Sequence, residues 1–184
     1  NRYSKDIPCH SVSCDNYTAS KRIGEYLLEQ GYSKLAFITG RKNTSTSQDR
    51  QRGFCEFLKS KGIDPVIEEG DYTYDGAYEA ALKLLKRKDR PEVIFGANDI
   101  TALGAIDAAK TLHLSIPEDI AIVGFDNIQM ASWPSYSLTT WEQPVDEMIE
   151  LTINTLLIEM NQKGSNSKPT LVSGRLIERN TTKS

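Results

Sequence analysis

The stretch Ile120-Ala121-Ile122-Val123-Gly124-Phe125-Asp126-Asn127 indicates the fold class of this chain most directly. It joins a continuous apolar run to two short polar residues. Such a run is typical of a strand buried on both faces of a parallel sheet, because helices cover both faces of that sheet. The segment Val93-Ile94-Phe95-Gly96-Ala97-Asn98-Asp99 repeats the pattern, and Leu35-Ala36-Phe37-Ile38-Thr39 is a third buried run. We therefore predict a parallel sheet whose strands end at polar side chains.

Amphipathic segments separate these runs. Strands and helices alternate at intervals of about 25–30 residues, which favours βαβ units in an α/β fold. Residues 126–140 are predicted to be irregular, and residues 164–168 to form a short flexible loop. Helices are predicted over 17–30, 49–61, 73–88, 99–112 and 145–162, and shorter strands over 11–14, 65–68, 171–172 and 176–177.

Composition excludes several classes of protein. The chain has 184 residues, of which 39% are hydrophobic and 26% charged, with a net charge of -3. A surface that binds duplex DNA usually shows a basic excess, which is missing here. Three cysteines without a C-x-x-C pair indicate free thiols in a reducing compartment, and we expect no metal and no cofactor. No apolar stretch reaches membrane-spanning length and no signal peptide is visible, so we expect a cytoplasmic protein.

Candidate ligand-binding residues follow the predicted strands. Ligands of open parallel sheets bind beyond the carboxyl ends of the strands. Carboxylates, amides, an arginine and an aromatic ring in that place suit a polyhydroxylated ligand, because they exchange hydrogen bonds with hydroxyls and stack on an apolar sugar face. The residues that follow strands are Asp15, Tyr72, Asn98 and Asp126, and the loop after the third buried run leads to Arg50.

Each candidate also has a structural interpretation. Asp99 is predicted to cap the helix that begins there, and Asn98 suits a turn. Arg50 could lie on a solvated helix face, and Trp133 and Trp141 could be core residues. No nucleophile–base set, phosphate-binding loop or dinucleotide-binding glycine pattern is present, so no enzymatic activity is predicted.

Six segments, taken in order, resemble the LacI/GalR family of transcriptional regulators. Departures from the family pattern are Ala19-Ser20, Tyr32, and Tyr136 in place of a proline, and the last makes Trp133 a further ligand-facing candidate. The matching segments are Asp15-Asn16 with Leu35-Ala36-Phe37-Ile38, Arg50-x2-Gly53-Phe54, Ala97-Asn98-Asp99-x2-Ala102-x-Gly104-Ala105, Ile116-Pro117 through Asp126-Asn127, Leu138-Thr139-Thr140-x2-Gln143-Pro144 and Leu176-Ile177-x-Arg179.

The resemblance implies a periplasmic-binding-protein-like fold of two lobes, each a parallel sheet with helices on both faces. It places residues 1–31 and 142–173 in an incomplete N-terminal lobe, and residues 32–141 and 174–184 in the C-terminal lobe. Because Asn1 resembles a position well inside the first lobe, we expect the helix-turn-helix headpiece and the first strands to lie upstream. The positions that match the family's effector contacts are Asp15, Thr46, Arg50, Tyr72, Asn98, Asp126 and Gln143.

The function implied is that of a ligand-responsive transcriptional regulator. A small effector, a sugar or a phosphosugar, is expected to bind between the lobes, and the core to form a homodimer. Operator DNA is expected to be bound only through the headpiece, and no membrane is involved. The alternative is a periplasmic sugar-binding protein of a transport system, which shares the fold but usually lacks the segment Leu138-Thr139-Thr140-x2-Gln143-Pro144.

Overall fold

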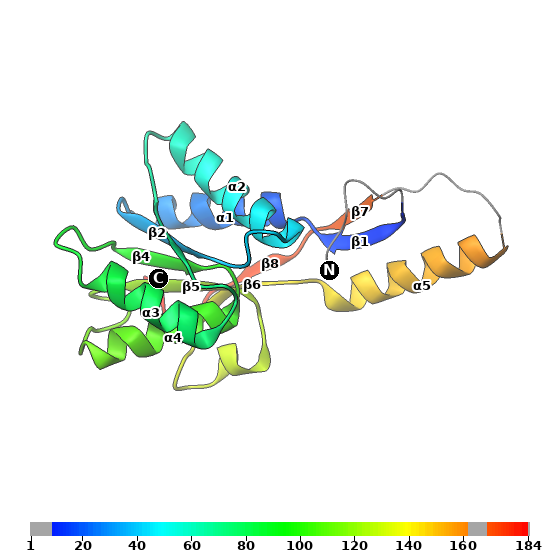
Figure 1. The fold of residues 1–184 in the computed structure, drawn as a ribbon. Coiled ribbons are helices and arrows are strands. Elements are labelled where there is room, and N and C mark those ends of the chain that lie inside the picture. The colour runs from blue at the N-terminus through cyan, green and yellow to red at the C-terminus, as the bar shows by residue number, and fades with distance from the viewer. Residues whose placement is uncertain (1–8, 162–168, 184) are drawn as a thin grey trace.

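The computed structural model describes residues 9–161 and 169–183, and within them it has two sheets (Figure 1). The larger sheet has six strands in the order β3-β2-β4-β5-β6-β8. The first five are parallel, and β8 is antiparallel to β6 at one edge. This confirms the predicted α/β class. The strands are β2 (Leu35–Thr39), β3 (Val66–Glu69), β4 (Val93–Gly96), β5 (Ala121–Asp126), β6 (Thr139–Glu142) and β8 (Arg175–Ile177).

Helices cover both faces of this sheet, as the continuous apolar runs predict. On one face, α1 (Asn16–Glu29) and α2 (Ser45–Ser60) enclose a core that contains three packed rings, Phe37, Phe54 and Phe95. On the other face, α3 (Tyr74–Leu85) and α4 (Asp99–Thr111) pack on small and branched side chains such as Ala36 and Ile122. Successive residues of a strand point to opposite faces, which divides each run between the two cores.

The second sheet has two strands and forms an arm beside the six-stranded body (Figure 1). Strand β1 (Ser11–Cys14) pairs in parallel with β7 (Pro169–Val172), and helix α5 (Val145–Asn161) packs on β1. Three chain segments join arm to body: the step from β1 to α1, the step from β6 to α5, and the step from β7 to β8.

Helix α1 packs on the body, whereas the predicted lobe boundary between residues 31 and 32 assigned it to the N-terminal lobe. Ile23 and Leu27 of α1 are fully buried in the core that the phenylalanines form, and α1 packs along α2. Helix α1 therefore lies on the six-stranded body, and the first crossing from the arm falls at Cys14 and Asp15. An amphipathic helix can cover either sheet, so its apolar pattern does not indicate which sheet it joins.

Two further segments differ from their predicted structure. The end of the stretch predicted to be irregular is strand β6, whose threonines are buried within the sheet, and a short 3₁₀ helix, η1 (Gln129–Ser132), precedes it. Helix α2 begins at Ser45, inside the predicted loop, because the Thr44 side chain caps it by accepting from the Ser47 N–H. The predicted loop 164–168 and the inference drawn from Asn1 lie outside the described residues.

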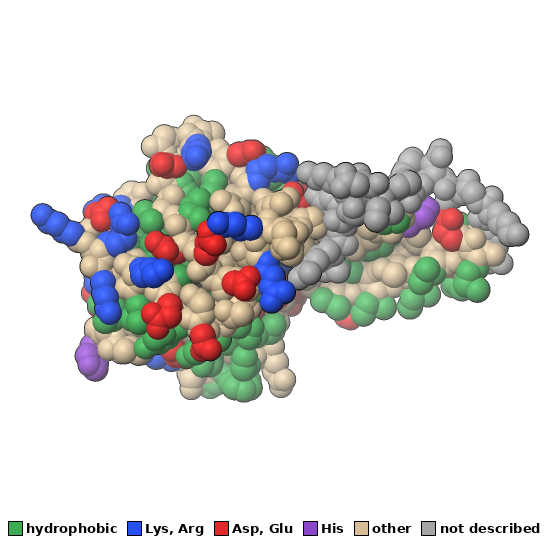
Figure 2. Space-filling view, in the orientation of Figure 1, with side chains coloured by type: hydrophobic (Ala, Val, Ile, Leu, Met, Phe, Trp, Pro, Cys, Tyr) green, Lys and Arg blue, Asp and Glu red, His purple; other side chains and the backbone are tan. Residues whose placement is uncertain are grey.

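The arm leaves apolar surface exposed. Figure 2 shows hydrophobic side chains along the lower side of α5. Half or more of each of these side chains is exposed, which is unusual for a helix of this composition. Within the described residues, no helix is long and apolar enough to cross a membrane. The exposed residues of α5 are Val145, Ile149, Ile153, Leu156, Leu157, Ile158 and Met160.

Candidate effector-binding site

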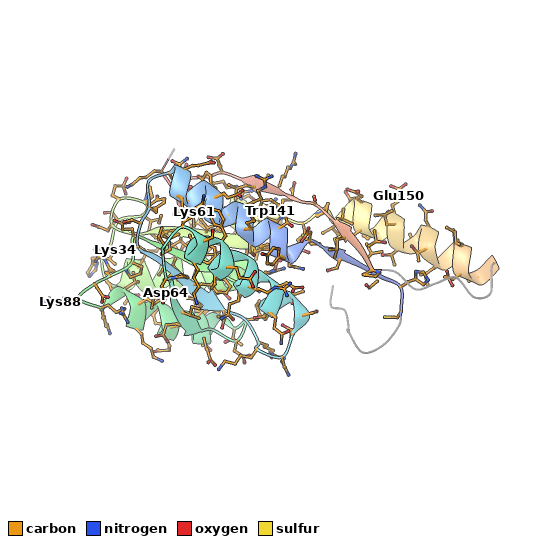
Figure 3. The ribbon with its side chains drawn as sticks, turned by 90° about the horizontal axis from the view of Figure 1, so that it is seen from above. Lys34, Lys61, Asp64, Lys88, Trp141 and Glu150 are labelled. Carbon is orange, nitrogen blue, oxygen red and sulfur yellow. The ribbon has the colours of Figure 1, made fainter. Side chains whose placement is uncertain are left out.

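The carboxyl ends of the body's parallel strands face the arm (Figure 3). Lys34 precedes β2 and Lys88 precedes β4, and both lie at the end of the body away from α5, on which Glu150 is labelled. Trp141, near the end of β6, lies on the side toward α5. The strand ends where ligands bind in parallel sheets therefore lie next to the three crossing segments.

Arg50 is buried beneath this edge of the sheet rather than exposed on a helix face. Its side chain is only 4% exposed, and its guanidinium lies 3.6 Å from the centre of the Phe125 ring. Its Nε donates to Asn16 Oδ1 at 2.8 Å and its Nη1 to the Ala97 carbonyl at 2.5 Å. Its Nη2 donates to Asp126 Oδ1 at 3.3 Å. Three of its five N–H groups are thus used inside the protein, and these hydrogen bonds hold Arg50 against Asn16, Ala97 and Asp126.

Asp126 is hydrogen-bonded to two other predicted site residues, Arg50 and Gln143. Its Oδ1 accepts from Gln143 Nε2 at 2.6 Å as well as from Arg50. Among the described residues its second carboxylate oxygen has no hydrogen-bond partner. Burial raises the pKa of Asp126, and the Arg50 charge and the Gln143 amide oppose that shift. An acceptor oxygen that is held in place and partly buried is well suited to bind a ligand hydroxyl.

The backbone at Asp126 is held in an unusual conformation. Its φ is 121°, and φ of the following Asn127 is 54°, both in the range that side chains rarely adopt. The turn is stabilised by Asp99, whose Oδ2 accepts from the Ile128 N–H at 2.8 Å. Residues held in such conformations cluster at functional sites, where surrounding contacts offset the strain.

Asp99 does not cap α4 as predicted. Asn98 is the N-cap, and its Oδ1 accepts from the Thr101 N–H at 2.9 Å. Asp99 is instead fully buried and accepts from the Thr140 hydroxyl at 2.5 Å. This burial raises the pKa of Asp99 to about 6, although the two hydrogen bonds that it accepts act to lower the pKa. One carboxylate thereby joins α4, β6 and the turn after β5.

The remaining predicted contacts divide between the edge of the sheet and its supports. Asp15 caps α1 by accepting from the Thr18 N–H at 3.0 Å. Thr46 is buried in the first turn of α2. Tyr72 has a φ of 60° and lies on Gly40, where a Cβ would overlap its ring. The Tyr72 hydroxyl is buried and has no partner among the described residues.

Trp133 lies apart from this group in its contacts. It follows η1 and is 46% exposed, so it is not a core residue. Within the described residues, no hydrogen bond joins its side chain to Asp126, Arg50 or Gln143. Trp141, in contrast, is 8% exposed and packs against Phe125, as the core interpretation predicts.

A pocket of about 520 Å³ opens between the strand ends and the start of α5. Sequence reasoning missed most of its lining, because single acidic residues at a helix start look like ordinary solvated residues. Asn16, which accepts from Arg50, is adjacent to Asp15 in the sequence, and no local pattern indicates that role. The pocket is lined by Asp126, Asn127, Glu142, Gln143, Pro144, Val145, Asp146, Glu147 and Arg175.

The lining is held by a chain of polar contacts across the crossing segments. Asn127 Nδ2 donates to Glu142 Oε1 at 2.8 Å, and Arg175 Nε donates to Glu142 Oε2 at 2.6 Å. Arg179 Nη2 donates to Asn127 Oδ1 at 2.8 Å. The hydrogen bonds from Arg175 and Asn127 lower the pKa of Glu142, which therefore carries a full negative charge at neutral pH.

The described residues hold no metal-binding cluster, and their two buried thiols are not ionised. No group of three or more His, Cys, Asp and Glu residues placed to hold a metal ion occurs in the described part of the chain. Burial raises the pKa of Cys14 and of Cys55 to about 11, so both thiols stay protonated at neutral pH. The polar side chains gathered here are suited to reversible hydrogen bonding with a polar ligand.

Fold and site together define a class, the periplasmic binding protein-like domain, whose family model matches residues 25–182. The chain belongs to this family and covers the effector-binding core of LacI-family regulators. The HTH-type transcriptional repressor PurR of Edwardsiella ictaluri is 34% identical over 159 residues, which are 85% of this chain and 47% of that protein. The ribose operon repressor of Escherichia coli K12 is 34% identical over 155 residues, which are 83% of this chain and 45% of that protein.

A solved structure agrees with these sequence matches. A sugar-binding transcriptional regulator of the LacI family from Escherichia coli, complexed with phosphate, has a TM-score of 0.85 and is 32% identical. The match covers 98% of this chain and 66% of that one. The chain spans about half the length of the curated relatives that it matches.

Proposed function

We propose that this chain is the ligand-binding core of a transcriptional regulator, which binds a small polyhydroxylated effector, a sugar, at the pocket beside Asp126. The observation that carries this proposal is the pairing of Asp126 with Gln143 and Arg50 at the carboxyl end of β5. The relatives are transcriptional repressors. This favours a regulator over the alternative, a transport receptor of the same fold.

The position of the pocket suggests how binding reaches the rest of the protein. Asp126 belongs to the body, whereas Val145 begins the arm helix, and Glu142 and Arg175 lie on crossing segments. A ligand in this pocket contacts both parts, so its affinity depends on their relative orientation. A ligand shifts a conformational equilibrium only by that difference in affinity. One hydrogen bond to a charged group is worth about 1.5–3 kcal/mol, which matches a typical allosteric coupling of about 1–3 kcal/mol.

The partners follow from the same proposal. The arm, with residues 142–173, is part of an N-terminal lobe that upstream sequence completes, and that sequence carries the headpiece that binds operator DNA. The core forms a homodimer, because paired half-sites of an operator call for two headpieces. The sequence upstream of Asn1 tests this: a helix-turn-helix supports the regulator, and a signal peptide contradicts it.

The site itself is tested by substituting Asp126. Calorimetry would first measure binding of ribose, glucose, their phosphates and adenine to the parent chain. Asp126→Ala should lower the affinity for the sugar that binds by at least about tenfold, or about 1.4 kcal/mol. The control is Asp107→Asn on α4, a carboxylate that also accepts several hydrogen bonds but does not line the pocket. Unchanged affinity in Asp126→Ala would place the site elsewhere.

A further inference from the structure

The charge of the pocket lining is strongly unbalanced. It contains four carboxylates, Asp126, Glu142, Asp146 and Glu147, and a single guanidinium, that of Arg175. The Arg175 charge is compensated, because its Nε donates to Glu142. An anion that enters the pocket therefore meets net negative charge at short range.

The cation that could attract a phosphate is buried beneath the edge of the sheet and is not part of the pocket lining. Arg50 is the only cation among the predicted site residues, and a guanidinium matches phosphate geometry. In the structure its three nitrogens donate to Asn16, to the Ala97 carbonyl and to Asp126. Turning the guanidinium toward a ligand would break these hydrogen bonds and leave buried acceptors unpaired.

The helix N-terminus at the pocket does not replace that cation. The first turn of α5 borders the pocket, and a free helix N-terminus favours an anion. Asp146 and Glu147 stand in this first turn and supply that negative charge from the chain itself. A phosphate group would have to compete with both carboxylates.

The hydrogen-bonding groups point to the same kind of ligand. Asn127 donates from its Nδ2 to Glu142 and accepts at its Oδ1 from Arg179, so both ends of its amide are already bonded within the protein. Apart from the Arg175 guanidinium, the charged groups that the described residues present to the pocket are carboxylates, including the unpaired oxygen of Asp126. Carboxylates only accept, so the ligand groups that meet them must donate. Sugar hydroxyls donate, whereas a phosphate dianion has no proton to give.

From these observations we infer that the pocket selects an uncharged polyhydroxyl ligand and rejects its phosphorylated derivative. This inference rests on the proposed function and names the chemical class of its effector. The relative complexed with phosphate shows that a family member can hold this anion. The acidic lining distinguishes this chain from a protein that uses such a group for recognition.

The experiment compares matched pairs by calorimetry: ribose with ribose 5-phosphate, and glucose with glucose 6-phosphate. In the pair that binds, the free sugar should bind at least about tenfold more tightly at low ionic strength, because charges within a Debye length repel the phosphate. High salt should reduce the difference in affinity between the sugar and its phosphate, because salt screens the repulsion. A phosphosugar that binds as tightly as its parent sugar overturns the inference and leaves the proposed function standing. Absence of binding by every sugar and phosphosugar contradicts both.

Two charge variants locate the effect. Asp146→Asn with Glu147→Gln removes two exposed carboxylates that make no contact with Asp126, and it should reduce the preference for the free sugar severalfold. Glu79→Gln with Glu118→Gln removes the same charge from exposed positions outside the pocket and should leave the preference unchanged. Equal effects of the two variants would mean that overall charge, rather than the pocket, discriminates. Denaturant unfolding of each variant verifies that the fold is intact.

Discussion

Asp99 shows how a single buried carboxylate organises the edge of the site. It holds Thr140 of β6 and the Ile128 N–H after β5, and it sits beside Gly124, where a Cβ would overlap its Oδ1. Gly124 is thus required by the close approach of Asp99 rather than by backbone freedom. The carboxylate fixes the turn that gives Asp126 its orientation, without contacting the pocket.

The buried carboxyl of Asp99 should make stability depend on pH. Its pKa is raised from 3.8 to about 6, so between these values the folded chain holds a proton that the unfolded chain releases. Stability should therefore fall as pH rises from about 4 to about 6, by about 3 kcal/mol for a shift of this size. Asp99→Asn can accept from the Ile128 N–H through its amide oxygen and donate from its amide nitrogen to the Thr140 hydroxyl, so it keeps both contacts and should lack this component. Urea unfolding of parent and variant at pH 4.5 and pH 7 measures the difference, and identical pH profiles would contradict the assignment.

At the scale of elements, helix α4 begins with a residue, Asn98, that caps the helix and also stands at the edge of the sheet where the site lies. Its N-cap Asn98 follows β4 directly, so the residue that starts the helix also stands at the carboxyl edge of the sheet. Both Asn98 hydrogen bonds, from the Thr101 N–H and the Thr101 hydroxyl, use its Oδ1. Within the described residues its amide nitrogen has no partner, which leaves a donor for a ligand.

Two substitutions of Asn98 separate these roles. Asn98→Ala removes the cap and should cost about 1 kcal/mol of stability. Asn98→Asp keeps an oxygen for Thr101 but replaces the amide donor with a second acceptor. It should hold stability near the parent value and still weaken effector binding. Thermal unfolding and calorimetry on the same samples test this, and full affinity in Asn98→Asp would limit Asn98 to capping.

Strand β6 illustrates an element that pattern alone does not reveal. Its Thr139 and Thr140 are polar, yet both are fully buried. Their hydroxyls find partners in distant parts of the chain, Thr140 with Asp99 and Thr139 with the Arg179 carbonyl. Buried polar groups are tolerated when they are hydrogen-bonded, and here the partners come from tertiary structure.

At the scale of the whole molecule, body and arm differ in how much they bury. The body has a six-stranded sheet covered on both faces, whereas the arm has two strands and one helix. A two-stranded sheet is marginally stable by itself. We therefore expect the arm to be the less stable part of the described chain.

Hydrogen exchange should show this difference in the isolated chain. Amides of residues 149–160 in α5 should exchange at least about tenfold faster than those of residues 103–111 in α4, because local opening of the arm exposes little additional apolar surface. Mass spectrometry of proteolytic fragments measures both regions in one sample. Equal protection of the two helices would mean that the arm is as stable as the body.

The sequence by itself determined the α/β class, the buried strands, and the placement of Asp126 and Asn98 at one edge of the sheet, because apolar runs and the residues after them are local features. Gln143 was expected there only from the family resemblance. Tertiary structure alone decided that α1 joins the body, that Arg50 points inward, and that Asp99 is buried instead of capping. It also brought Glu142, Asp146, Glu147 and Arg175 together at one pocket. Those outcomes depend on which helices, strands and loops contact one another in the folded chain. Neither periodicity nor spacing along the sequence predicts contacts between segments that are distant in it.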